Sequence, residues 1–133
     1  MPYRMIEHTA DLSFEVTADS FRELIGESLR AMTGWTDPAW GDALAERCFS
    51  VEAPDRAVLL VDLLNEALTQ SQIHREAYDR IEFRILEERR AEGHFIGRSI
   101  TGALDEVKAV TYHGAKVEVN PEGLWRATIL MDI

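Results

Sequence analysis

Two aspartates that could bind a metal ion lie near opposite ends of the sequence. Asp11 is close to the N-terminus, and Asp132 precedes Ile133, the last residue. Carboxylate oxygens are preferred ligands of hard divalent cations. Because the terminal carboxylate lies one residue beyond Asp132, two oxygen-rich groups could converge there. Most terminal acids are simply solvated, so composition alone gives this metal site little weight.

The element that would carry Asp132 is a β-strand from Trp125 to the C-terminus. Its apolar residues alternate, which is typical of a strand packed on one side. A turn at Asn120–Gly123 precedes it. The residues expected on its buried face are Trp125, Ala127, Ile129 and Met131.

Asp11 lies close to the start of another predicted strand, Ser13–Ala18. The tetrapeptide from His8 to Asp11 connects this strand to a further one at Tyr3–Glu7. In such a loop the polar side chains usually bond to the backbone; the alternative is a carboxylate ligand beside the His8 imidazole. Pairing of the first and last strands would bring Asp11 and Asp132 together, so the site would close only in the folded protein.

Two helices are predicted between these strands. Ser20 and Glu23 have capping-box spacing, and the apolar positions that follow recur at helical intervals up to Gly34. A loop with two core-packed tryptophans is expected at Trp35–Gly41. Asp55 can cap a second helix at Arg56–His74.

The second helix is amphipathic. Its inner face is expected to contain Leu60, Leu63, Leu64, Ala67, Leu68 and Ser71. Its opposite face is expected to be solvated and contains Asp62, Asn65, Glu66 and Thr69. Asp62 and Glu66, four residues apart, could instead form half of a metal site, but such pairs are usually solvated.

The remaining strands complete an α+β fold. We expect strands at Arg47–Ala53 and Val107–His113, and a hairpin formed by Arg80–Leu86 and His94–Ile100. The predicted architecture is a single domain over residues 1–133, with two helices packed on antiparallel or mixed β-sheet in two layers.

Composition narrows the functional classes. The net charge of −10 disfavours broad direct contact with nucleic acid and favours cations or basic partners. One cysteine, Cys48, excludes an internal disulfide and a cysteine-based zinc cluster, and it fits a reducing compartment. No secretory signal or membrane span is recognisable, so we expect a cytoplasmic protein. Phosphate-loop, dinucleotide, nucleophile-elbow and zinc-protease motifs are absent from the sequence.

Several separated stretches resemble the archease family, in the right order and over nearly the whole length. They are Glu7-His8-Thr9-Ala10-Asp11, Leu60-Val61-Asp62-Leu63-Leu64-Asn65-Glu66, Glu106-Val107-Lys108-Ala109-Val110-Thr111-Tyr112-His113-Gly114 and the final Asp132-Ile133. The resemblance implies a non-catalytic protein cofactor of the RtcB-type, GTP-dependent RNA ligase. Such a cofactor promotes guanylylation of the ligase and multiple turnover in tRNA splicing or RNA repair.

The resemblance also implies roles for individual residues. Asp11 and Asp132 match the family's metal-binding acids, with Ile133 as a further oxygen donor; the expected ion is Ca²⁺ or Mg²⁺, with Mn²⁺ also acceptable. Lys108 and His113 match the family's characteristic strand and, with His8, are candidates for partner or nucleotide contact. An acidic chain suits docking to a basic RNA-binding ligase better than binding RNA itself.

Two other functions remain open from the residues. One is a small metal-dependent hydrolase that uses the same carboxylates, with His8 or His113 as general base. The other is a chaperone-like scaffold in which the acidic site is structural, so that its loss would affect function only through stability.

Overall fold

The computed structural model describes residues 11–102 and 107–133. The elements along the described chain are β1 (Asp11–Ala18), α1 (Phe21–Thr36), β2 (Ala39–Glu52), α2 (Arg56–His74), β3 (Glu76–Leu86), β4 (Arg90–Thr101), β5 (Ala109–Val119) and β6 (Trp125–Asp132). The strand predicted at Tyr3–Glu7, and His8 with it, lie outside the described residues and stay predictions. No described helix is long and apolar enough to cross a membrane.

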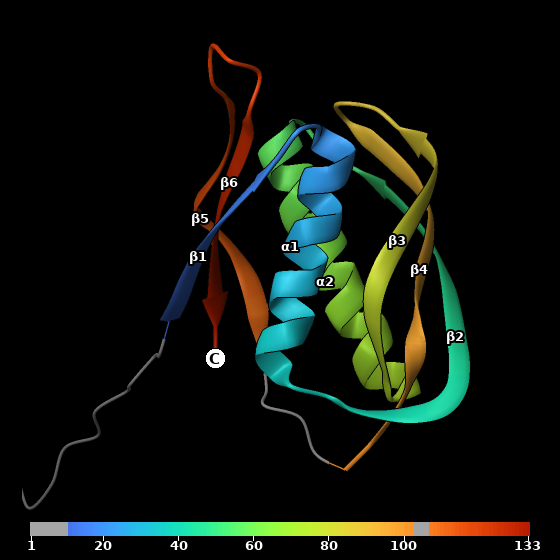
Figure 1. The fold of residues 1–133 in the computed structure, drawn as a ribbon. Coiled ribbons are helices and arrows are strands. Elements are labelled where there is room, and N and C mark those ends of the chain that lie inside the picture. The colour runs from blue at the N-terminus through green and yellow to red at the C-terminus, as the bar shows by residue number, and fades with distance from the viewer. Residues whose placement is uncertain (1–10, 103–106) are drawn as a thin grey trace, which may run out of the picture.

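The two helices lie between two three-stranded sheets, ordered β1-β6-β5 and β2-β4-β3 (Figure 1). Every described strand pair is antiparallel. The α+β prediction is therefore confirmed, but the expected two layers are wrong. The reason lies in α2, whose buried residues surround much of the helix instead of forming one stripe. They are Leu59, Leu60, Val61, Leu63, Leu64 and Ala67.

Helix α2 has the predicted bounds because its ends are marked by local chemistry. The Asp55 carboxylate accepts a hydrogen bond from the Val58 amide at 2.9 Å, which satisfies a free backbone donor of the first turn. At the other end Arg75 adopts a left-handed conformation (φ 54°), and its amide donates to the Ser71 carbonyl.

Helix α1 begins at the predicted cap, Ser20, but does not end at Gly34. It continues through Thr36, and the left-handed Asp37 then terminates it by donating its amide to the Gly34 carbonyl at 3.1 Å. The extra turn is retained because Thr36 is buried and Trp35 packs against the core. The loop predicted at Trp35–Gly41 is thus shorter, and Trp40 lies in β2 with 41% of its surface exposed.

The second sheet confirms the predicted hairpin of β3 and β4. Stacked rings of its own three strands lie side by side within it, with centroids 4.6 Å apart for Phe49 and Phe95 and 5.6 Å for Tyr78 and Phe95. Helix α1 is bonded to this sheet through the Thr33 hydroxyl, which donates to the Tyr78 carbonyl. On the other side, Phe21 of α1 stacks on Trp125 of β6 at 5.6 Å. The helical layer therefore contacts both sheets, including the one that contains the first and last described strands.

Candidate functional site

The candidate site is a pair of aspartates at one end of the sheet β1-β6-β5. Strands β1 and β6 are antiparallel, and their register places Asp11 directly opposite Asp132. Directly opposed residues project on the same face of a sheet, with Cβ atoms about 4.5–5.5 Å apart. The prediction that the first and last strands bring these two acids together is confirmed.

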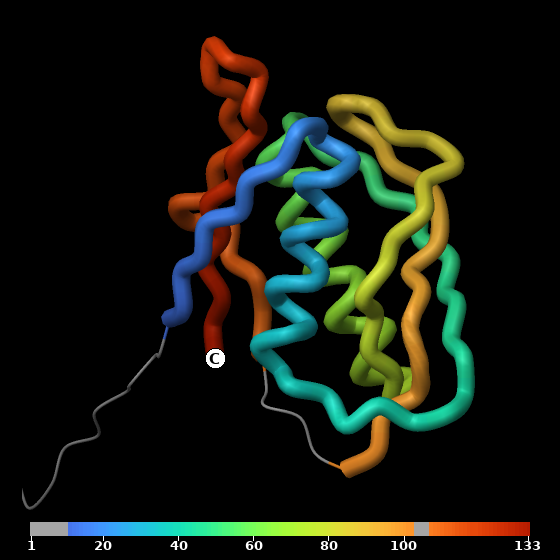
Figure 2. Tube along the Cα trace, in the orientation of Figure 1, coloured from blue at the N-terminus to red at the C-terminus, as the bar shows by residue number. Residues whose placement is uncertain are grey.

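Alternation along both strands explains why the pair faces outward. In β6 the side chains of Ala127, Ile129 and Met131 are completely buried, as predicted, so Asp132 projects to the opposite face. In β1 Asp11 is exposed. Figure 2 shows the start of β1 close to the C-terminus at the lower end of this sheet. The acids therefore lie on the face of the sheet that points away from both described helices.

The Asp132 carboxyl group changes the pKa of Asp11. Hydrogen bonding to Asp132 raises the pKa of Asp11, and desolvation and the negative charge of Asp132 raise it further. The charge of His113 acts in the opposite direction and lowers the pKa of Asp11. Two carboxylates sharing a site cannot both ionise freely, and a cation placed between them would relieve the repulsion.

The pair fits an open cation site better than a complete protein cage. Within residues 11–102 and 107–133, no cluster of three or more His, Cys, Asp or Glu side chains could hold a metal ion. The predicted half-site at Asp62 and Glu66 thus gains no third ligand there. Mg²⁺ is commonly bound by one or two protein carboxylates together with water and substrate phosphates. The donor set of Asp11 and Asp132 matches that chemistry.

Strand β5 lies beside Asp132 on the other side of β6. Ala109 is opposite Asp132 in register, and the Lys108 amide donates to the Asp132 carbonyl at 2.8 Å. Lys108 is exposed. The structure therefore brings the Lys108 backbone next to Asp132; the predicted role of Lys108 in partner or nucleotide contact stays a prediction.

A wide bulge interrupts β5 immediately after this contact. Thr111 pairs with Leu130, but the next register pair is Lys116 with Thr128, so four residues of β5 lie opposite Ile129 alone. These bulge residues are Tyr112, His113, Gly114 and Ala115, and Gly114 has a positive φ of 71°. Simple alternation through His113, as the sequence predicts, ends at Thr111.

His113 is exposed within this bulge, and its amide donates to the Thr111 hydroxyl at 3.1 Å. Its charge lowers the pKa of Asp11, and its strand β5 is the neighbour of β6, which carries Asp132. Ile133 follows Asp132 and packs its side chain partly against the core. Of the predicted site residues, the structure thus gathers Asp11, Asp132, Ile133, Lys108 and His113 around one end of this sheet.

The polar face of α2 is not simply solvated, and sequence reasoning missed its contacts. The Asn65 side chain both donates to the Val110 carbonyl and accepts from the Val110 amide, at 2.8 Å each. The Tyr112 hydroxyl donates to the Asp62 carboxylate, which raises the pKa of Tyr112. The only sequence signal was that both helix residues belong to one of the stretches used for the family resemblance.

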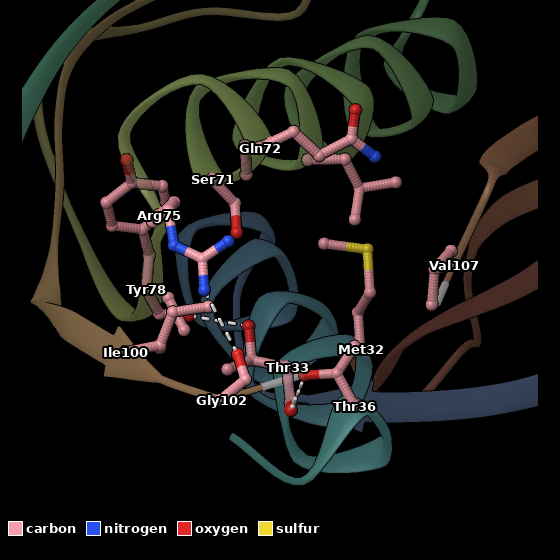
Figure 3. Close-up of a pocket in the computed structure, with 13 residues that line it drawn as sticks. Met32, Thr33, Thr36, Ser71, Gln72, Arg75, Tyr78, Ile100, Gly102 and Val107 are labelled. Carbon is pink, nitrogen blue, oxygen red and sulfur yellow. Dashed lines mark hydrogen bonds between the residues drawn. The ribbon is translucent and has the colours of Figure 1, made fainter. Parts of the chain in front are cut away.

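A cavity of about 380 Å³ lies between the C-terminal halves of the two helices (Figure 3). Neither Asp11 nor Asp132 lines it. Two of its polar side chains are bonded to backbone: the Thr33 hydroxyl donates to the Tyr78 carbonyl at 2.6 Å, and Arg75 donates to the Gly102 carbonyl at 3.2 Å. These groups tie the helix ends to the second sheet, so the acid pair is the stronger candidate site.

Comparison with known proteins supports one family. The model of the Archease protein family matches residues 3–133. "Protein archease" of Methanopyrus kandleri is 32% identical, and the match covers 100% of both chains. "Protein archease" of Methanosarcina acetivorans is 28% identical, over 98% of this chain and 95% of the relative.

Solved structures show the same fold. The crystal structure of an archease, described as a possible chaperone, from Thermotoga maritima has a TM-score of 0.72 at 23% identity and covers 100% of this chain and 98% of its own. The solution structure of a protein from Methanobacterium thermoautotrophicum has a TM-score of 0.63 at 22% identity, with 96% of each chain covered. Because the family model spans nearly the whole sequence, this chain belongs to the archease family.

Proposed function

We propose that this protein is an accessory activator of an RtcB-type, GTP-dependent RNA ligase, and that Asp11 and Asp132 act by holding a divalent cation. The observation that best supports the proposal is their direct pairing across β1 and β6. The ligase performs the joining chemistry. The activator promotes guanylylation of the ligase and allows the ligase to carry out further rounds of tRNA splicing or RNA repair.

The incomplete donor set favours a role at an interface. Two carboxylates leave most positions of a Ca²⁺ or Mg²⁺ ion for other oxygen ligands, with Mn²⁺ as an alternative ion and Ile133 as a further oxygen donor. Nucleotide phosphates and water are the ligands that usually complete a Mg²⁺ site of this kind. A bound cation would supply positive charge that can neutralise nucleotide phosphates.

The surroundings of the pair suit contact with such a partner. Lys108 is exposed next to Asp132, and His113 is exposed on the neighbouring bulge. We assign both to contact with the ligase or its nucleotide, and His8 stays a candidate for the same role. The net charge of −10 favours docking to a basic, RNA-binding protein and would steer their association.

The test is a ligation assay with the cognate ligase, GTP, Mg²⁺ or Mn²⁺, and an excess of RNA bearing 2′,3′-cyclic-phosphate and 5′-hydroxyl ends. We expect the ligase alone to stop after about one round per molecule and to continue through many rounds when this protein is added. Equal turnover with and without the protein, under every metal condition, would reject the activator function. Hydrolysis of the RNA ends by this protein without ligase would instead favour the hydrolase alternative.

A further inference from the structure

Strand β1 pairs with β6 without interruption, but on its other edge the end of β6 that carries Asp132 is paired with only a short piece of β5. The bulge separates three register pairs from the rest of the β5–β6 hairpin: Ala109 with Asp132, Val110 with Met131, and Thr111 with Leu130. A two-stranded ribbon of a few residues is marginal by itself. Because the bulge interrupts the ladder, the hairpin turn at the far end cannot fix the position of this segment.

The free edge of the same segment faces α2. Val110 is 2% exposed, so its backbone amide and carbonyl need partners within the protein. Asn65 provides both, at 2.8 Å each, and its carboxamide thereby takes the place of the peptide group of a neighbouring strand. One turn earlier on α2, Asp62 accepts the hydroxyl of Tyr112, the first residue of the bulge. The helix therefore anchors β5 on both sides of the position where its ladder is interrupted.

The anchored segment is linked directly to the acid pair. Ala109, next to Val110, is opposite Asp132, and the Lys108 amide donates to the Asp132 carbonyl. On its other side Asp132 is opposite Asp11. A displacement of the Lys108–Val110 segment would therefore move the Asp132 backbone relative to Asp11.

We propose that Asn65 is a positioning residue for the acid pair: by clamping Val110 to α2, it sets the place of Asp132 opposite Asp11. The proposal deepens the proposed function, on which its metal-binding consequence rests. It also assigns a role to the helix face that the sequence suggests is merely solvated. The cation site would thus be built by two strands and stiffened by a helix that contributes no ligand to it.

The first test measures hydrogen exchange of the Lys108 amide, which reports the bond to Asp132 without any metal or ligase. Asn65→Leu removes both bonds at similar volume and should accelerate exchange at Lys108 by roughly tenfold, relative to a core amide of α2 such as Leu63. Asn65→Asp keeps the acceptor for the Val110 amide and should restore part of the protection.

The matched control is Thr33→Val. Thr33 makes the same kind of link, from a helix side chain to the backbone of a strand, but it joins α1 to β3 in the other sheet. It should lower the melting temperature without selectively accelerating exchange at Lys108. Unchanged exchange at Lys108 in Asn65→Leu, or equal acceleration in Thr33→Val, would overturn the proposal.

The second test titrates the same variants with Mn²⁺. We expect Asn65→Leu to bind Mn²⁺ about tenfold more weakly than wild type, a loss of the size expected for a residue that orients a ligand, whereas Thr33→Val binds normally. Wild-type affinity in Asn65→Leu, despite faster exchange at Lys108, would also overturn the positioning role. If the wild-type protein binds no divalent ion, the cation part of the proposed function fails, and the exchange measurement alone decides the role of Asn65.

Discussion

Asp11 and Asp132, from opposite ends of the sequence, are direct partners in the β1–β6 ladder. Each therefore presents a carboxylate to the other on the outer face of the sheet, and the charge of Asp132 contributes to the raised pKa of Asp11. Folding creates this repulsion, since the two residues are far apart in the unfolded chain. A cation bound between the two carboxylates would relieve this repulsion.

Replacing either aspartate by asparagine should separate the effect of the repulsion on stability from the effect of cation binding. We expect Asp11→Asn and Asp132→Asn each to raise the melting temperature in chelator, because the repulsion is removed. Wild type should gain stability from a divalent ion, about 2.7 kcal/mol when the ion is at about 100 times its Kd. Both variants should lose that gain in thermal melts with Mg²⁺, Ca²⁺ or Mn²⁺.

Glu15→Gln is the matched control for these melts, since Glu15 is another exposed acid of β1 but lies opposite Thr128 instead of an acid. It should keep the full response to divalent ions. If Glu15→Gln abolished the response, or Asp132→Asn retained it, the ion would have to bind elsewhere.

The acid pair should also make the stability of the metal-free protein depend on pH. The pKa of Asp11 in the folded state lies above its ordinary value of 3.8, so the folded state keeps this proton to higher pH than the unfolded state does. The contribution of the pair to stability therefore falls as pH rises through that interval. Melts of wild type against Asp132→Asn in chelator should show the difference growing from acid to neutral pH; a constant difference would contradict it.

The acid pair could be anticipated from sequence because its position depends on local rules. The alternation from Trp125 to Asp132 and the cap at Asp55 are each readable within a few residues. Helix α2 has the predicted bounds, and β6 begins at the predicted residue and ends one residue earlier than predicted. Once β1 and β6 are paired in this register, Asp11 and Asp132 lie opposite each other. Gly34 misled the prediction because the packing of Trp35 and Thr36, a tertiary effect, overrides its preference for helix ends.

The bulge in β5 and the hydrogen bonds from Asn65, which surround the acid pair, could not be predicted from the sequence in the same way. A bulge adds residues without changing their types, so the run from Val107 to His113 gives no sign that the ladder stops at Thr111. The clamp by Asn65 is also hidden, because a polar residue on an amphipathic helix has the same sequence pattern whether it faces water or a strand edge. Such contacts depend on tertiary structure.

The link between Tyr112 and Asp62 makes a prediction of its own. The Asp62 carboxylate accepts a hydrogen bond from the Tyr112 hydroxyl, and this bond is the main reason that the pKa of Tyr112 lies above its ordinary value of 10.0. Asp62→Asn should lower the pKa of Tyr112 toward that value, as followed by ¹³C NMR of the tyrosine Cζ atoms.

Tyr78 provides an internal control in the same spectra. Its pKa is raised chiefly by burial and then by Glu76, so it should be unaffected by Asp62→Asn. A Tyr112 titration that did not move would show that the contact does not persist in solution. Because the folded pKa is raised, the stability contributed by this bond should be lost as pH rises above about 10.

The sheet β2-β4-β3 contains a hydrogen-bond network around Glu76 that gives a further prediction. Arg47 donates to both Glu76 oxygens, at 2.6 and 3.0 Å, and the Tyr78 hydroxyl donates at 2.8 Å. These bonds, with that to Arg47 the largest, lower the pKa of Glu76. Glu76→Gln should cost about 1–2 kcal/mol of unfolding free energy at pH 7, less than a fully buried charged bond because Arg47 is partly exposed.

The stability that Glu76 contributes changes with pH in the opposite direction to the contribution of the acid pair. Because the folded pKa of Glu76 is depressed, its contribution is present above the ordinary value of 4.5 and is lost as pH falls through the folded value. Denaturant unfolding of wild type and Glu76→Gln should therefore converge in acid. A difference that persisted unchanged at pH 2 would show that packing, not charge, causes it.

The most direct test of the central claim is the number of ligations per ligase molecule supported by Asp132→Asn, compared with wild type and Glu15→Gln, at saturating GTP and Mg²⁺ or Mn²⁺. All three proteins should be folded at the assay temperature, as confirmed by melting. We predict that wild type and Glu15→Gln sustain many turnovers, whereas Asp132→Asn leaves the ligase near a single round. Wild-type turnover with Asp132→Asn would contradict the claim that the acid pair mediates activation.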